Sequence, residues 1–157
     1  MKLTLGKEDG MQSKISALLI MPRERRLPLL EHLEACGVDL LTACDCGEAH
    51  RILDGRRPVQ VVLTDVKLND GDWRNVLVEV SHSDKRAEVI VCASLVDHNL
   101  WIDALEGGAY DVIVRPYQRE EVRRILVSAA ARSDMRSLDP ARGSQGGISF
   151  AGRSAVV

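Results

Sequence analysis

Short runs of aliphatic residues alternate along this chain with longer segments in which apolar residues recur at helical spacing. This alternation is typical of βαβ units built around a parallel sheet. Two of the runs are almost continuously apolar, as expected for strands covered by helices on both faces. The pattern therefore predicts a single α/β domain with a doubly wound, five-stranded parallel sheet. The expected strands are 15–21, 38–43, 59–64, 88–93 and 110–114.

The starts of the helices between these strands are marked by aspartates. Asp45 is followed by a glutamate three residues later, which is the spacing of a capping box, and the next helices are expected to start after Asp72 and Asp97. Pro28 is tolerated only in the first turn of a helix, so the first helix should begin near Leu27, after a long loop.

The apolar pattern also sets the expected limits of the folded unit. The last helix carries an apolar stripe over 122–130. The 25 residues that follow Arg132 include nine glycines or serines and little apolar periodicity. We expect a flexible N-terminal segment over 1–13, a folded domain over 14–132 and a disordered Gly/Ser-rich tail over 133–157.

Composition narrows the class of protein. A chain of 157 residues with 45% hydrophobic content can fill one core but not two full domains. Its 21 Lys and Arg against 23 Asp and Glu do not favour nucleic acid or an anionic membrane surface. No apolar run suggests a membrane span or secretion signal, so we expect a cytoplasmic protein with four reduced cysteines. The absence of a P-loop, a dinucleotide fingerprint or a GxSxG motif argues against an enzyme.

Candidate chemistry gathers where the predicted strands end. In an open parallel sheet, ligand sites lie at the carboxyl ends of the strands. Asp65 follows the third strand, and cationic residues follow the first and fifth. The residues expected to line this edge are Met21, Arg23, Glu24, Asp65, Ala93, Ser94, Arg115 and Pro116. Cys44 and Cys46 with His50 fall short of a four-ligand metal site, so no metal is expected there.

Three segments carry a family resemblance. VVLTDVKLNDGDW, VIVCAS and GGAYDVIVRPY occur in an order and spacing that resembles the receiver domain of bacterial two-component response regulators. The resemblance implies a flavodoxin-like (βα)5 fold with strand order 2-1-3-4-5. It also implies that Asp65 corresponds to the aspartate that accepts a phosphoryl group from a histidine kinase.

Other positions depart from the family pattern. Receivers hold Mg²⁺ with two acidic residues at the end of the first strand, where this chain has Ile20 and Met21, neither of which binds a hard cation. The family's Ser or Thr after the fourth strand corresponds to Ala93, with Ser94 and Cys92 as imperfect substitutes.

The fifth strand departs from the pattern as well. The family lysine before proline corresponds to Arg115, whose planar guanidinium replaces a point charge. The aromatic switch position corresponds to Val112, and Tyr110 lies two residues away, on the same side of the strand by alternation.

These departures predict a degenerate receiver that needs no cofactor. Phosphoryl transfer depends on neutralising the phosphoryl oxygens, so it should be very slow without Mg²⁺. We hypothesise that Arg23, Arg25 or Arg26, together with Arg115, pairs with Asp65 in place of the metal.

The predicted role is protein–protein signalling, with a histidine kinase, another signalling protein or an identical copy as partner. The resemblance places the interaction face on the fourth helix, fifth strand and fifth helix, which carry Trp101, Tyr110, Val112 and Tyr117. One alternative is a working, Mg²⁺-dependent receiver phosphorylated on Asp65. Another is a scaffold that binds partners through its tail, whose only apolar cluster is 148–150.

Overall fold

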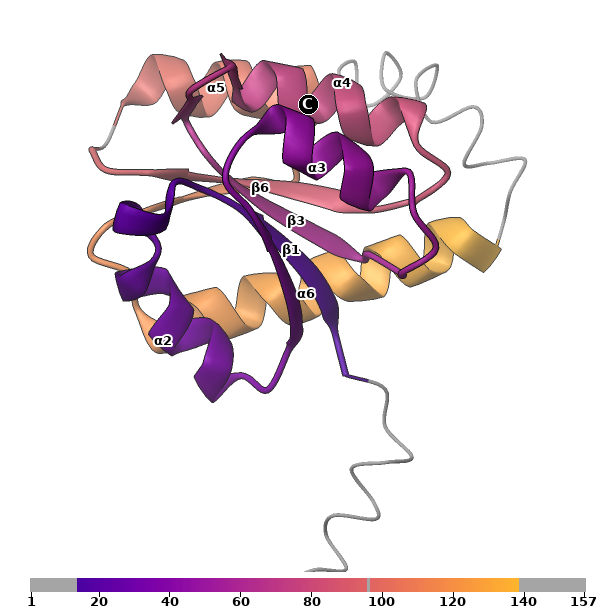
Figure 1. The fold of residues 1–157 in the computed structure, drawn as a ribbon. Helices are drawn as coiled ribbons and strands as arrows, with labels where there is room; N and C mark the ends of the chain where they lie inside the picture. The colour runs from indigo at the N-terminus through magenta and orange to yellow at the C-terminus, as the bar shows by residue number, and fades with distance from the viewer. Residues whose placement is uncertain (1–13, 96, 139–157) are drawn as a thin grey trace, which may run out of the picture.

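A five-stranded parallel sheet forms the centre of the molecule (Figure 1). The computed structural model describes residues 14–95 and 97–138. The sheet order is β2-β1-β3-β6-β7, which confirms the predicted order 2-1-3-4-5 among the five main strands. These strands are β1 (Ser16–Ile20), β2 (Asp39–Ala43), β3 (Val61–Asp65), β6 (Glu88–Ala93) and β7 (Asp111–Val114).

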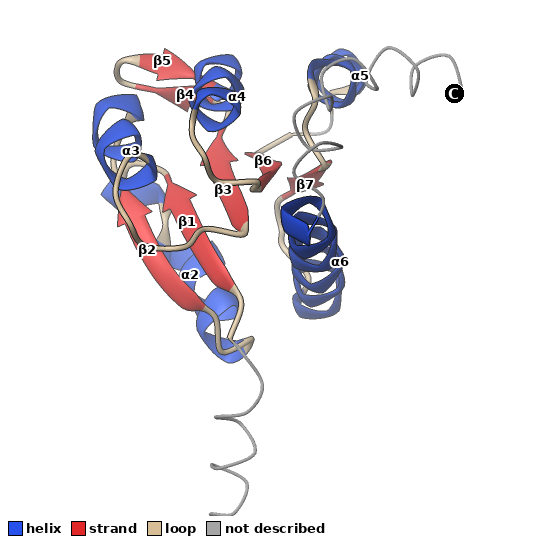
Figure 2. Cartoon of the chain, turned by 90° about the vertical axis from the view of Figure 1, so that its right-hand side faces the viewer, coloured by secondary structure: helices blue, strands red, loops and turns tan. Residues whose placement is uncertain are grey.

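Helices cover both faces of the sheet, as the near-continuous apolar strands predict (Figure 2). One face carries α2 (Leu27–Ala35) and α6 (Arg119–Leu138). The other face carries α3 (Cys46–Leu53), α4 (Trp73–His82) and α5 (His98–Gly107). A short 3-10 helix, η1 (Arg23–Arg25), lies between β1 and α2.

The predicted helix starts are confirmed. The Asp45 carboxylate accepts a hydrogen bond from the Glu48 N–H at 2.9 Å, and Asp72 caps α4 in a complete capping box. Asp97 accepts from the first backbone N–H groups of α5. The first long helix begins at Leu27 with proline in its first turn. Each cap satisfies N–H groups that a helix leaves without a partner.

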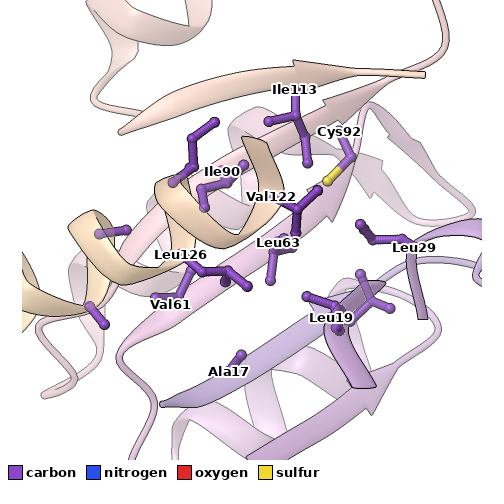
Figure 3. Packing of buried hydrophobic residues seen from close by; sticks show 14 of the residues in the cluster. Ala17, Leu19, Leu29, Val61, Leu63, Ile90, Cys92, Ile113, Val122 and Leu126 are labelled. Carbon is purple, nitrogen blue, oxygen red and sulfur yellow. The ribbon is translucent and has the colours of Figure 1, made fainter. Parts of the chain in front are cut away.

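Packing against the sheet fixes the positions of the helices. On the α2–α6 face, Leu29 of α2 and Val122 and Leu126 of α6 pack against Leu19 and Leu63 of the central strands (Figure 3). All of these side chains are at most 1% exposed. The rigid sheet therefore holds the carboxyl ends of β1, β3 and β6 at fixed separations.

Two features correct or extend the sequence prediction. The helix α6 continues to Leu138, six residues beyond the expected boundary at 132, and Ser133 is buried. The predicted boundary was wrong because polar contacts, and not an apolar stripe, anchor the extension. Residues 1–13 and 139–157, for which a flexible segment and a disordered tail were expected, lie outside the described residues.

The loop after β3 also forms an unpredicted antiparallel hairpin, β4 (Lys67–Leu68) and β5 (Gly71–Asp72). Within the described ranges, no helix is long and apolar enough to cross a membrane.

Candidate functional site

Asp65 is the last residue of β3 and lies at the predicted carboxyl edge of the sheet. Its side chain is only 3% exposed, although it ends a strand. The backbone N–H of Val66 donates to Asp65 Oδ1 at 2.8 Å. A carboxylate this buried needs charged or hydrogen-bonding partners to offset its lost hydration.

Arg25 of η1 supplies the charged partner. Its Nε lies 2.6 Å from Asp65 Oδ2, and its Nη2 donates to Asp65 Oδ1 at 3.3 Å. The same Nη2 donates to Ser94 Oγ at 3.2 Å. Within the described residues, no N–H is aligned to donate a hydrogen bond to Oδ2. The contact between Arg25 Nε and Asp65 Oδ2 is therefore an ion pair without a hydrogen bond. The hypothesis that an arginine from the segment after β1 pairs with Asp65 is confirmed for Arg25.

The neighbouring Arg26 fixes the position of η1. Its Nε donates to the Met21 carbonyl oxygen at 2.8 Å, and its Nη2 donates to Cys44 Sγ at 3.4 Å. Consecutive arginines thus tie η1 to the ends of β1, β2 and β3. Arg23 and Glu24 are exposed, and the structure shows no side-chain hydrogen bond or ion pair for either in its described part.

Arg115 does not take part in this pairing. It lies after β7, its side chain is exposed, and its backbone N–H donates to the Ala93 carbonyl oxygen at 3.0 Å. The described residues contain no ion pair between Arg115 and Asp65, so the second half of the hypothesis is not confirmed. Pro116, next to it, is also exposed.

The residues at the end of β1 do not fit a magnesium ion. Ile20 and Met21 are 0% and 2% exposed and pack into apolar clusters on opposite faces of the sheet. Mg²⁺ requires oxygen ligands, and the carboxylate at the end of the neighbouring strand β3, Asp65, is already paired with Arg25. Across 14–95 and 97–138, no group of three His, Cys, Asp or Glu side chains is placed to hold a metal.

The Cys44–Cys46 segment has a structural role. The Cys46 N–H donates to Asp70, and burial, followed by the nearby Asp70, raises the pKa of the Cys46 thiol to about 12. His50 pairs with Glu79 of α4 at 2.6 Å, and this hydrogen bond raises the His50 pKa. The Asp70 carboxylate and the His50–Glu79 pair therefore link α3 to the turn between β4 and β5 and to α4.

An open cleft of about 340 Å³ lies beside the Arg25–Asp65 pair. Ala93, which is buried, and Ser94, which is exposed, line it as predicted. Sequence reasoning missed five lining residues that lie between the end of β3 and β4 or between the end of β6 and the first turn of α5. They are Val66, Lys67, Leu95, Asp97 and Leu100.

The predicted interaction face is only partly exposed. Trp101 on α5 is 48% exposed, whereas Val112 is buried against α4 and α5. Tyr110 and Tyr117 are half-buried and pack with the α2–α6 cluster, and burial raises the pKa of Tyr117. Tyr110 therefore does not share a side with Val112. The strand begins at Asp111, so alternation does not extend to Tyr110.

Comparisons with known proteins agree with this architecture. No family model matches the chain. The chemotaxis protein CheY of Listeria monocytogenes is 31% identical over 83 residues, which are 53% of this chain and 69% of that protein.

Solved structures show the same fold. A response regulator receiver domain from Clostridium thermocellum superposes with a TM-score of 0.68 at 21% identity, over 78% of this chain and 98% of that one. The receiver domain of a sensor histidine kinase from Pseudomonas aeruginosa, with magnesium in its active site cleft, has a TM-score of 0.65 at 20% identity, over 76% and 99% of the two chains.

Proposed function

Because this chain belongs to the CheY-like family of response regulator receiver domains, we propose that it acts in two-component signalling as a pseudo-receiver with an arginine-held acceptor position. The observation that carries the proposal is the ion pair between Arg25 and the buried Asp65. A guanidinium at this place supplies the positive charge that a family metal supplies, but it offers no coordination site for an incoming phosphoryl group.

The missing metal ligands support the same conclusion. A phosphoryl group carries charge on three oxygens that must be neutralised during transfer. Loss of a divalent ion removes several kcal/mol of transition-state stabilisation, or roughly three or more orders of magnitude in rate. Ile20 and Met21 provide no oxygen ligands for such an ion, and Ala93 has no hydroxyl for the phosphoryl group. We therefore propose a binding protein without catalytic activity or cofactor.

We propose that the partner is a histidine kinase or another signalling protein. The exposed Trp101 on α5 supports this part of the proposal, because aromatic side chains dominate binding energy at protein interfaces. A receiver that keeps one conformation presents such a surface constantly. Its output would then depend on the amount of protein rather than on phosphorylation.

The test is intact-mass analysis after incubation with a small-molecule phosphodonor, with and without Mg²⁺. Wild type and Asp65→Asn should both keep their unmodified masses. Arg25→Ala should also stay unmodified, because removing the guanidinium does not create metal ligands. An Mg²⁺-dependent adduct on wild type that Asp65→Asn lacks would contradict the proposal.

One observation favours the alternative of a working receiver. The Arg25 side chain is 44% exposed beside an open cleft, so it has room to move away from Asp65. In that case Lys67 and Arg25 would neutralise the phosphoryl group. The same experiment decides, because a working receiver forms the Asp65-dependent adduct.

A further inference from the structure

Apolar side chains form one wall of the cleft beside the Arg25–Asp65 pair. Val66 follows β3, while Leu95 and Leu100 lie between the end of β6 and the first turn of α5. Leu95 is 78% exposed, and Val66 and Leu100 are half-buried. The cleft volume of about 340 Å³ lies within the range of about 300–1,000 Å³ that is typical of small-molecule sites. A small molecule with an apolar part would remove this wall from solvent.

The two carboxylates of the cleft already have partners. Asp65 is paired with Arg25. Asp97 Oδ1 accepts hydrogen bonds from the N–H groups of Asn99 and Leu100 at 3.0 and 3.3 Å, at the positive end of the α5 dipole. Both negative charges are therefore offset within the protein itself.

The hydrogen-bond donors of the cleft, in contrast, are not all used. The exposed Lys67 forms no side-chain hydrogen bond or ion pair with any residue of 14–95 or 97–138. Ser94 Oγ accepts from Arg25 Nη2, but its own proton has no acceptor among the same residues. Arg25 directs Nε and Nη2 toward Asp65 and Ser94, and its Nη1 has no acceptor there. The cleft therefore carries one positive charge without a counter-charge, on Lys67, and two further free donors.

We propose that this cleft binds a small organic carboxylate with an apolar body. The carboxylate of the ligand accepts from Lys67, Ser94 and Arg25 Nη1, and its apolar body covers Val66 and Leu95. This inference deepens the proposed function, and it rests on that function in one respect, because the cleft must stay free of a phosphoryl group.

Charge and polarity favour an organic monoanion over inorganic phosphate. Asp65 already balances Arg25, so Lys67 alone requires a counter-charge, and one negative charge supplies it. Phosphate carries more than one negative charge at neutral pH and has no apolar part to cover the wall. An organic carboxylate therefore uses both parts of the cleft, whereas phosphate uses only the polar part.

NMR titration of the isotope-labelled full chain with phenylacetate tests the proposal. Phenylacetate should bind saturably, with a Kd of about 1 mM or below, and should shift the amide signals of Val66 and Leu95. Three probes serve as controls, and each should bind at least about tenfold more weakly. Acetate lacks the apolar body, benzylamine carries the opposite charge, and inorganic phosphate has the charge of a phosphoryl group without an apolar part.

Two pairs of variants locate the site. Lys67→Gln removes the counter-charge and should weaken phenylacetate binding about fivefold or more. Lys14→Gln, at the opposite edge of the sheet, should leave the Kd unchanged. Leu95→Gln should weaken binding by a similar factor, because it makes the apolar wall polar, whereas Val78→Gln on α4 should not. All four positions are exposed, and circular dichroism spectra identical to wild type would establish that the variants fold.

Three results would overturn the proposal. They are the absence of saturable shifts with phenylacetate up to about 10 mM, a Kd that Lys67→Gln and Leu95→Gln leave unchanged, and tighter binding of phosphate than of phenylacetate. The outcome is separable from the phosphorylation test. An Mg²⁺-dependent adduct on Asp65, with phenylacetate still binding to the unmodified protein, would count against the proposed function alone. An unmodified Asp65 without phenylacetate binding would count against this inference alone.

Discussion

At the scale of single residues, the pairing of Asp65 with Arg25 decides what the cleft can do. Oδ1 accepts hydrogen bonds from Val66 and Arg25, while Oδ2 depends on the charge of Arg25 alone. Removing one partner from a buried pair leaves the other charge without compensation, which costs more than the pair itself contributes. Arg25 is half-exposed, so water takes over part of its role when it is removed.

Arg25→Ala should therefore lower the free energy of unfolding by about 1–2 kcal/mol in urea denaturation. In an Asp65→Asn background the same substitution should cost much less, because the neutral amide does not need a cation. An equal cost in both backgrounds would mean that Arg25 acts through Ser94 rather than through Asp65.

The sequence predicted that an arginine would pair with Asp65, but it did not identify which one. Arg23, Arg25 and Arg26 lie within six positions after the end of β1, and all could reach the strand ends in an irregular loop. The choice depends on the turn that η1 makes after Pro22, which directs Arg26 to Met21 and Cys44 and leaves Arg25 over Asp65. A short 3-10 turn of this kind has no clear pattern of apolar residues.

At the scale of elements, the hairpin β4–β5 is fixed to the start of α3. The Asp70 carboxylate accepts hydrogen bonds from the N–H groups of Cys46 at 2.8 Å and Gly47 at 3.0 Å. These are orphan donors of the first helical turn, where the helix dipole also favours a negative charge. The hydrogen bond from the Cys46 N–H is the main cause that lowers the pKa of Asp70 below its ordinary value of 3.8.

Asp70→Asn should destabilise the protein by about 0.5–1 kcal/mol at pH 7. Since the folded-state pKa is the lower one, ionised Asp70 stabilises the fold above pH 3.8, and this contribution is lost as the pH falls through the folded-state pKa. The difference between wild type and variant, measured by urea denaturation at several pH values, should therefore shrink toward acid.

Asp54→Asn, at the C-terminal cap of the same helix, is the matched control. It should be neutral or slightly stabilising, because a negative charge is unfavourable at that end. A difference for Asp70→Asn that stays constant down to pH 2 would contradict the interpretation.

Sequence reasoning identified the caps within each helix, since their spacing is local. It missed the Asp70 contact, because the hydrogen-bonded groups are 23 and 24 residues apart.

At the scale of the whole molecule, the C-terminal part of α6 closes the end of the sheet opposite the cleft. Glu88, the first residue of β6, is 6% exposed, and Arg136 donates to it at 2.9 Å while Arg132 lies 3.4 Å away. Gln60, just before β3, donates to Asp134 at 2.7 Å and accepts from the Ser16 N–H. Polar groups on α6 thus hold β1, β3 and β6 together at their amino ends.

These contacts explain why the domain boundary differs from its prediction. Hydrophobic periodicity detects a helix only where the helix packs with apolar side chains, and the segment 133–138 offers Met135 and Leu138 on the exposed side. Its buried side consists of Ser133, and its anchors are charged residues whose partners lie 48 to 74 residues away. In the sequence, charged residues that anchor a helix in this way cannot be told from charged residues on a solvent-exposed helix face. The apolar strands and helices, in contrast, were predictable because their pattern reflects the core directly.

A chain ending at 132 should therefore be less stable than one ending at 138, by at least about 2 kcal/mol in urea denaturation. The shorter chain loses the Arg136–Glu88 and Asp134–Gln60 contacts and leaves a buried carboxylate with one cation at 3.4 Å. If it fails to fold, Arg136→Ala in the full chain measures the largest part of the loss and should cost about 1–2 kcal/mol. Ser137→Ala, at an exposed position of the same turn, should cost nearly nothing. Equal stability of the two chain lengths would show that the extension only continues a helix already complete at 132, and that the sequence-based boundary marks the true end of the folding unit.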